Sequence, residues 1–242
     1  MSVWVPRAII AVVVVGVAIS IVSISVGTGG PQAVEIDGRA ETQALIAGIT
    51  QEGARLGSEE AEVVMDVFSD LRSPGSAAFQ REVVEPIIES AVRDSNLVQI
   101  NLRHFSFGRS GVTEAAIAAT AAGEQGHQWQ FADLVFRNLS NVGQGLVDEV
   151  FLDQIAQVTP GLEKEEWAAE FEQELAAQSD DPEYESVVDR DGELAFEMEL
   201  PAEPAVVVTG IGGVEELTGT PSLEDVQAAI DRVSVASADL SP

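Results

Sequence analysis

The sequence predicts an α/β domain in which a block of helices interrupts a small sheet, preceded by one N-terminal transmembrane helix. Short β-branched runs near both ends of the domain predict the strands, and Ala-rich stretches with helical spacing predict the block between them. The transmembrane helix is predicted by residues 8–26, which contain no charged side chain. With 242 residues, 45% of them hydrophobic, the chain can build one domain with its own core.

The predicted elements follow one another in the order β-α-β, a helical block, and β-β-α. The first two strands flank a helix, so they should form a parallel pair. Pro86 lies inside that helix and should kink it. Strands are expected at residues 62–68, 97–102, 205–209 and 214–217, and helices at 40–49, 77–93, 113–138 with a break near Gly123 and Gly126, 148–158, 163–177, 184–198 and 221–233.

The uncharged N-terminal run is close to the roughly 20 residues that a helix needs to cross a bilayer. Arg7 precedes the run and acidic residues follow it, so the positive-inside rule places the N-terminus in the cytoplasm and the domain outside the cell membrane. We therefore expect a cytoplasmic stub and single-pass anchor over residues 1–27 and a tether over 28–47. A cleaved signal peptide is the main alternative, although the run is long for one and lacks a good cleavage site.

Charge and cysteine content exclude several classes of function. Acidic residues outnumber basic ones by 41 to 12, and the resulting net charge of −29 makes nucleic acid an unsuitable partner. The chain contains no cysteine, which excludes disulfides, thiolate nucleophiles and cysteine-bound metals. Its two histidines, His104 and His127, are far apart in sequence, so we expect structural roles for both and no metal site.

Four segments occur in an order that is typical of one protein family. They are residues 48–57, 68–71 (FSDL), 124–136 with its Gln-Gly-His-Gln-Trp sequence, and 200–208 (LPAEPAVVV). Together they resemble the DsbA-like thioredoxin family of extracytoplasmic disulfide oxidoreductases. The resemblance implies a thioredoxin-like fold with an all-helical insertion: a domain over residues 48–233, with the insertion at about 110–199 and a tail at 234–242.

The family's redox motif, Cys-x-x-Cys, begins the first helix after the first strand. Ser73-Pro74-Gly75-Ser76 stands at this place, so both sulfur atoms are replaced by oxygen. A serine hydroxyl is too weakly acidic to be ionised by a helix N-terminus and cannot form a mixed disulfide, so the redox activity does not carry over. We expect Ser73 to cap the helix, Pro74 to take its first position and Ser76 to face solvent.

A second group of relatives suggests another role for Ser73. Kappa-class glutathione transferases and 2-hydroxychromene-2-carboxylate isomerases carry serine at this place, where the hydroxyl binds the thiolate of glutathione. The sequence is similar to the isomerase-type Ser-Pro-Tyr-Ser, but Gly75 replaces the aromatic residue. In this alternative Ser73 serves a glutathione-dependent enzyme, and glutathione or a similar thiol is the cofactor.

Pro204 matches the proline beside the family's active site, which is cis in the family and whose neighbouring backbone pairs with an extended substrate peptide. The resemblance therefore implies a binding groove formed by Ser73, Gly75, Glu203, Pro204 and Ala205. Relatives more often have Thr or Val where this chain has Glu203, so peptide binding could be altered or lost.

The sequence favours a binding role over an enzymatic one, without a resident cofactor. The first hypothesis is a redox-inactive, membrane-anchored module that binds extended or unfolded polypeptide in a chaperone-like manner. The second is the glutathione-dependent enzyme that uses Ser73, and the third is a structural subunit of a membrane complex. The oligomeric state and the identity of the partner stay open.

Overall fold

The computed structural model describes residues 34–94, 97–107, 113–142, 147–180 and 186–235. These residues belong to one unit that begins at Gln32. The predicted membrane anchor at residues 8–26 lies outside the described residues. Within the described ranges, no helix has the length and apolar character needed to span a bilayer.

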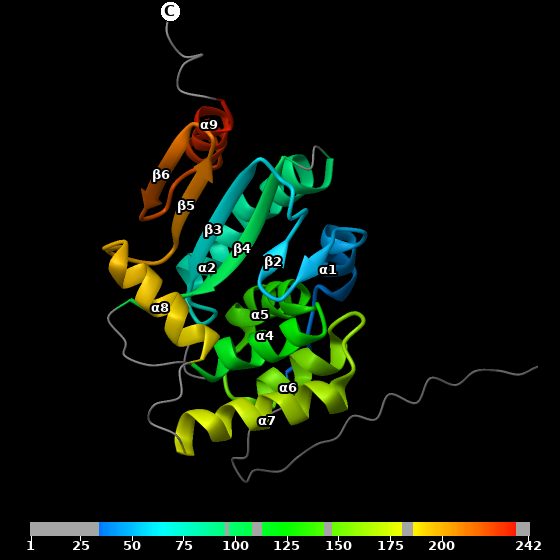
Figure 1. Ribbon diagram of the computed structural model, residues 1–242. Helices are drawn as coiled ribbons and strands as arrows, with labels where there is room; N and C mark the ends of the chain where they lie inside the picture. The colour runs from blue at the N-terminus through cyan, green and yellow to red at the C-terminus, as the bar shows by residue number, and fades with distance from the viewer. Residues whose placement is uncertain (1–33, 95–96, 108–112, 143–146, 181–185, 236–242) are drawn as a thin grey trace, which may run out of the picture. The chain divides into compact units, whose positions relative to one another are not determined.

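A six-stranded sheet with the order β1-β2-β4-β3-β5-β6 forms the centre of the unit (Figure 1). The central strands β3 (Val63–Ser69) and β4 (Val98–His104) run parallel, which confirms the predicted β-α-β unit. β5 (Ala205–Gly210) pairs antiparallel with β3, and β6 (Gly213–Thr218) pairs with β5 as the predicted hairpin. Val63 and Val67 on β3 and the valines of β5 are buried, as expected for strands that are covered by helices, whereas the edge strand β6 is largely exposed.

Two short strands were not predicted. β1 (Gln51–Glu52) and β2 (Arg55–Leu56) form a hairpin that adds antiparallel to β4, where Leu56 lies opposite Ile100 and is fully buried. Strands of two residues are too short to show the alternation of polar and apolar residues on which sequence-based prediction depends.

The helix α1 (Arg39–Ile46) confirms the helix expected at residues 40–49, most of which falls in the segment 28–47 that the sequence also assigned to a tether. Its Leu45 and Ile46 side chains are buried in the core, and Thr42 Oγ1 donates a 2.5 Å hydrogen bond to the buried carboxylate of Asp133 on α5. The structure therefore includes α1 in the folded unit. Most of its surface is polar, and only these long-range contacts distinguish it from a linker.

A long helical run follows β3 and contains the predicted irregularity. It consists of α2 (Pro74–Phe79), η1 (Gln80–Val84), α3 (Glu85–Ile87) and η2 (Ile88–Asp94), of which η1 and η2 are π-helical. Pro86 lies in α3, between the two π-helical segments. Because proline has no backbone N–H, the regular hydrogen-bond pattern cannot continue through it, and the irregularity extends over both neighbouring segments.

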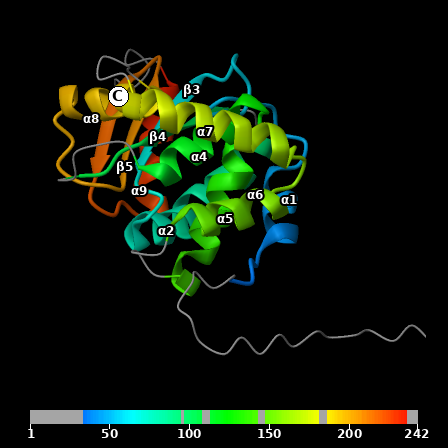
Figure 2. The same ribbon diagram turned by 90° about the horizontal axis from the view of Figure 1, so that it is seen from below.

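The helical insertion lies between β4 and β5 in sequence. Its helices are α4 (Glu114–Glu124), α5 (Gln128–Val142), α6 (Glu149–Val158), α7 (Lys164–Asp180) and α8 (Val187–Glu197). The first four gather beyond the carboxyl ends of β3 and β4, and both views show α8 beside the sheet (Figures 1 and 2). The final helix, α9 (Leu223–Ser234), corresponds to the helix expected at residues 221–233; Ser222 is its N-cap, and the helix packs on β5.

A stack of aromatic rings forms the centre of the insertion. The Trp167 ring lies between Phe131 and Phe171, with centroid distances of 5.7 and 5.2 Å. Its Nε1 donates a 2.9 Å hydrogen bond to the carbonyl of Ala118 on α4. One side chain thus holds three helices of the insertion together.

We predict that Trp167→Ala lowers the free energy of unfolding by about 3–5 kcal/mol, because it leaves a large cavity and removes a buried hydrogen bond. Urea denaturation followed by circular dichroism measures this difference. Glu172→Ala, on an exposed position of the same helix, should change the free energy by less than about 0.5 kcal/mol. Equal effects of the two substitutions would contradict the packing described.

Candidate functional site

The start of α2 carries the four residues that replace the redox motif. Ser73 is the N-cap: its Oγ accepts a 3.3 Å hydrogen bond from the Ser76 backbone N–H, and Pro74 takes the first helical position, as predicted. The expectation for Ser76 was wrong. Its side chain is buried, and its Oγ accepts a 3.3 Å hydrogen bond from the backbone N–H of Asp70, because the loop before the helix folds back over it.

The loop before β5 lies against this helix start. The Glu203–Pro204 peptide bond is cis, as the resemblance implied, and Pro204 is buried. A Cβ atom added to Gly75 would lie 3.4 Å from Ser73 Oγ and 3.8 Å from Pro204 Cδ. The fold therefore brings together the two predicted segments, Ser73–Ser76 and Glu203–Ala205; that they bind a ligand stays a prediction.

Glu203 connects this loop to the end of β4. Its Oε2 accepts a 3.1 Å hydrogen bond from the backbone N–H of Phe107. Within the described parts of the chain, neither the backbone N–H of Glu203 nor its carbonyl has a hydrogen-bond partner. The Glu203 side chain is thus used inside the protein, and the backbone beside the cis bond is left unpaired within the described residues.

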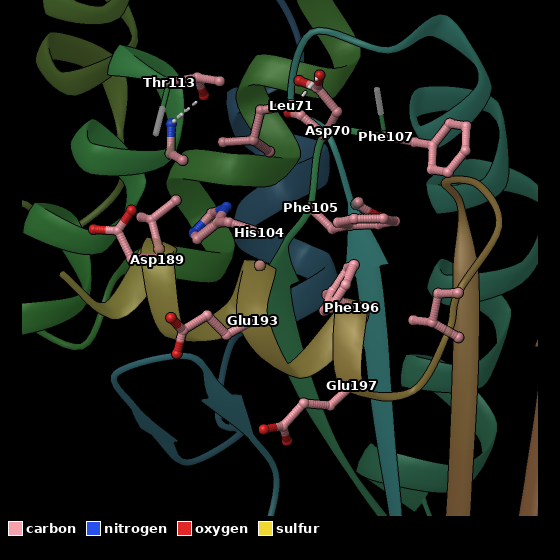
Figure 3. A pocket seen from close by; sticks show the side chains of 16 residues that line it. Asp70, Leu71, His104, Phe105, Phe107, Thr113, Asp189, Glu193, Phe196 and Glu197 are labelled. Atoms are coloured by element: carbon pink, nitrogen blue, oxygen red, sulfur yellow. Dashed lines mark hydrogen bonds between the residues drawn. The ribbon is translucent and has the colours of Figure 1, made fainter. Parts of the chain in front are cut away.

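A cavity of about 810 Å³ adjoins the two loops (Figure 3). Its walls come from the ends of β3 and β4, the start of α4 and one side of α8. The lining residues are Ser69, Asp70, Leu71, His104, Phe105, Ser106, Phe107, Thr113, Ala116, Val188, Asp189, Gly192, Glu193, Phe196, Glu197 and Leu200. The predicted groove residues are not among them, so the cavity is a neighbouring feature that the sequence did not predict.

Aromatic side chains form the apolar part of this cavity. Phe105 contacts the buried Phe68 edge-on at a centroid distance of 6.4 Å, and Phe107 contacts Phe105 in the same way at 6.3 Å. Phe107 is 54% exposed and Phe196 on α8 is 84% exposed. The Phe-x-Phe pattern directly after a strand is the one sequence signal that could have indicated this feature, since core phenylalanines do not usually continue past the end of a strand.

Asp70 forms an ionised, hydrogen-bonded corner of the cavity. Its carboxylate accepts hydrogen bonds from the Arg72 guanidinium at 3.1 Å and from the Ser106 hydroxyl at 2.8 Å, and its side chain is almost fully buried. Burial alone would raise the pKa of the carboxyl group, but the hydrogen bonds from Arg72 and Ser106 outweigh it and hold the pKa below its ordinary value of 3.8.

His104 is neutral and buried at the floor of the cavity. Burial lowers the pKa of His104 to about 4, against the opposing effect of the Asp70 charge. Its Nε2 lies 3.1 Å from the side-chain nitrogen of Gln128, which donates to the ring in this arrangement. His127 also has a pKa lowered by burial, and its ring packs closely on Gly161.

Asp191 holds α8 against the sheet beneath the cavity. Its buried carboxylate accepts hydrogen bonds from the His104 backbone N–H at 2.9 Å and from Arg103 Nη1 at 3.2 Å. Arg103 Nε also donates to Asp66 on β3 at 2.7 Å. Burial raises the pKa of Asp191 although both donors favour its ionised form. These contacts fix the distance between α8 and the strand ends.

The described residues offer little to a metal ion or an anionic cofactor. Within them, no group of three or more His, Asp or Glu side chains could hold a metal ion. Among the described residues that line the cavity, four are acidic and none is Lys or Arg. Chemically, the site can accept hydrogen bonds, receive apolar side chains and pair with an extended backbone.

Comparison with known proteins supports the predicted fold. Residues 50–232 match the sequence profile of a protein family described as Thioredoxin. Alpha-DsbA1 from Wolbachia pipientis is 19% identical with a TM-score of 0.59, and the match covers 80% of this chain and 95% of that one. For BdbD from Bacillus subtilis, the identity is 18%, the TM-score 0.60, and the coverage 77% of this chain and 97% of that one.

DsbA from Chlamydia trachomatis has 14% identity and a TM-score of 0.60, with 86% of this chain and 96% of that one covered. A comparison with curated proteins found no significant match. At these identities the similarity shows the fold alone. It confirms the predicted thioredoxin-like α/β architecture with a DsbA-like helical insertion, in a chain without cysteine.

We predict that Asp70→Asn lowers the free energy of unfolding by about 2 kcal/mol at pH 7, because it removes the charge from a buried, multiply hydrogen-bonded carboxylate. The folded-state pKa lies below the unfolded value, so the folded chain binds fewer protons and this stability is present above the ordinary pKa of 3.8. It is lost as the pH falls through the lower, folded-state pKa.

Urea denaturation of both proteins at several pH values should therefore show a difference that narrows below about pH 4. The matched control is Glu216→Gln, an exposed position on β6, which should follow the wild type at every pH. A difference that stays constant down to about pH 2 would mean that the Asp70 charge is not the cause.

Proposed function

The chain belongs to the thioredoxin family, and we propose that it is a membrane-anchored, redox-inactive member that binds extended polypeptide outside the cell membrane. Redox inactivity follows from the absence of cysteine, since thiol–disulfide exchange requires an attacking thiolate. The observation that carries the binding role is the cavity with exposed Phe107 and Phe196, directly beside the unpaired backbone of Glu203.

The backbone at Glu203 supports binding of an extended chain. A free N–H and a free carbonyl at the start of a strand can hydrogen-bond to a polypeptide laid alongside, which supplies affinity independent of side-chain sequence. Gly75 at the start of α2 lies next to Pro204, so α2 borders this backbone on one side. The hydrogen bond from Phe107 N–H to Glu203 holds the loop in place on the other side.

The exposed phenylalanines support recognition of apolar side chains. Large apolar side chains on a soluble surface are usually covered, and aromatic groups that border a cavity commonly anchor a partner. A volume of about 810 Å³ lies within the range of about 300–1,000 Å³ that ligand sites occupy. It can receive one or two side chains of a bound segment.

Membrane anchoring is supported by sequence alone. Residues 8–26 are uncharged, Arg7 precedes them, and acidic residues follow, which favours a single helix with the domain on the extracytoplasmic side. An extracytoplasmic domain of this size can dispense with disulfides, because its hydrophobic core is sufficient.

The glutathione-dependent alternative receives less support from the geometry. Ser73 Oγ already accepts the hydrogen bond of the helix cap, and Ser73 does not line the cavity. Glutathione is an anion, and the acidic lining disfavours it. Displacement of a bound polypeptide by added glutathione would favour this alternative.

One observation favours the third role, a structural subunit. Ile211 and Val214, at the turn between β5 and β6, are 75% and 58% exposed. They form a second apolar surface at the opposite end of β5 from Pro204. A partner that docks there would depend on these residues and not on Phe196.

We predict that the full chain binds a permanently unfolded, carboxymethylated polypeptide and that Phe196→Ser weakens this binding about tenfold, since an anchoring aromatic side chain is lost. Fluorescence anisotropy measures the dissociation constant. Ile211→Ser removes an equally exposed apolar side chain and should leave the constant unchanged. If Ile211→Ser weakens the complex and Phe196→Ser does not, the polypeptide binds at the β5–β6 hairpin and not at the cavity.

We also predict that Ser73→Cys/Ser76→Cys restores a reversible disulfide, because the helix start retains the family geometry and lowers the pKa of the first thiol. Mass spectrometry under defined glutathione ratios detects the oxidised form. Ser73→Cys alone should form only mixed disulfides with glutathione. A folded double variant that never forms an internal disulfide would contradict this prediction. It would show that the helix start lacks the geometry that a disulfide requires.

A further inference from the structure

We propose that Glu203 is a positioning residue of the polypeptide site: its carboxylate holds Phe107 next to the backbone with which the bound chain pairs. The inference rests on the proposed polypeptide-binding function and adds the residue that sets its preference for large apolar side chains. It is carried by the hydrogen bonds of the segment after β4 and by the separate uses of the Glu203 side chain and backbone.

The segment Phe105–Phe107, directly after β4, is attached to neighbouring loops one residue at a time. The backbone N–H of Phe105 donates a 3.1 Å hydrogen bond to the carbonyl of Ser69. The Ser106 hydroxyl donates at 2.8 Å to the carboxylate of Asp70. The first two residues of the segment are therefore fixed to the end of β3 and the loop that follows it.

Phe107 is attached to a different loop. Its backbone N–H donates to Glu203 Oε2 at 3.1 Å, and within the described ranges Phe107 forms no other hydrogen bond. Its ring contacts Phe105 edge-on, as Figure 3 shows at the border of the cavity, but Phe107 is 54% exposed. Because burial stabilises in proportion to the apolar area removed from water, packing holds this ring weakly. The hydrogen bond to Glu203 therefore determines where the ring lies.

The backbone of Glu203 is available to a bound chain. Its N–H and carbonyl have no partner among the described residues, while Pro204 is buried and Ala205 begins β5. An extended chain that pairs here lies close to Phe107, because a single glutamate side chain spans the distance between the two. A large apolar side chain of the bound chain can then pack on the Phe107 ring.

Removal of the Glu203 acceptor should release Phe107 and little else. Phe105 keeps its hydrogen bond to Ser69 and its edge-on contact with the buried Phe68 at 6.4 Å. The hydrogen bond to Glu203 lies at an exposed position, so its loss leaves no buried group unpaired. The substitution is therefore expected to change the recognition of a side chain without unfolding the site.

The competing explanation is that Glu203 only stabilises the loop before β5, in which case every peptide should bind more weakly without it. The test uses two labelled, uncharged peptides of Gly and Ser that differ in one central residue, Trp or Ala. Each is titrated against the full chain, and fluorescence anisotropy gives the dissociation constants. We expect the Trp peptide to bind about tenfold tighter than the Ala peptide.

Substitutions at Glu203 separate the two explanations. Glu203→Val removes the acceptor and should reduce the ratio of the dissociation constants to about threefold or less, through weaker binding of the Trp peptide alone. Glu203→Gln removes the same charge but keeps an oxygen acceptor, so it should retain most of the tenfold ratio. The matched control outside the site is Glu216→Val, at an exposed position of β6, which should bind both peptides as the wild type does.

Two further measurements examine the contact itself. The Phe107 amide proton should exchange with solvent faster in Glu203→Val than in the wild type or in Glu203→Gln, because it has lost its acceptor. Phe107→Ala should lower the peptide ratio by itself, and the addition of Glu203→Val should lower it no further, since both changes remove one interaction. Thermal unfolding verifies that each variant folds.

The outcomes distinguish this inference from the proposed function. An unchanged ratio in Glu203→Val, or an equal loss in Glu203→Gln, would overturn the positioning role and leave polypeptide binding intact. Equal weakening of both peptides in Glu203→Val would assign Glu203 to loop stability and overturn the role as well. Absence of binding by both peptides to the wild type would contradict the proposed function itself.

Discussion

The buried carboxylate of Asp191 determines how the helical insertion meets the sheet, and the cavity depends on this contact. It joins α8 to the end of β4 through the His104 backbone and the Arg103 guanidinium, which in turn binds Asp66 on β3. A buried charge needs such partners, since an unpaired carboxylate in this position would be strongly destabilising. Because the donors are fixed in the sheet, this contact positions α8 beside the strand ends, where one side of the helix lines the cavity.

The replacement of sulfur by oxygen removes the chemistry of the thioredoxin fold and preserves its local structure. A helix N-cap needs an oxygen that accepts a backbone hydrogen bond, and Ser73 meets this need. Ser76 uses its hydroxyl to hold the loop at Asp70. The surfaces proposed to bind a polypeptide, which are the backbone before β5 and the neighbouring cavity, need no thiol. Loss of redox activity and retention of a binding surface are therefore physically compatible.

Sequence-based reasoning succeeded where local pattern decides structure. The runs that became β3, β4, β5 and β6 are β-branched and bounded by turn residues, and Ser73 and Ser222 are typical helix caps. It failed where structure depends on distant contacts. The two-residue strands β1 and β2 pair with the edge of β4, and α1, expected as a helix within a tether, is held in the folded unit by a buried hydrogen bond from Thr42 to Asp133. Ser76 is buried by a loop that precedes it.

The sequence by itself determined the order of the elements, the absence of thiol chemistry and the excess of negative charge, because each depends on residue type or on short-range spacing. Only the tertiary structure decided that Gly75 meets Pro204, that Phe107 and Phe196 border one cavity, and that His104 is neutral. These properties arise from burial and from contacts between segments far apart in the chain. Burial and long-range contacts leave no periodic signal in the sequence. The site is therefore formed, and can be identified, only when the helical insertion packs against the sheet.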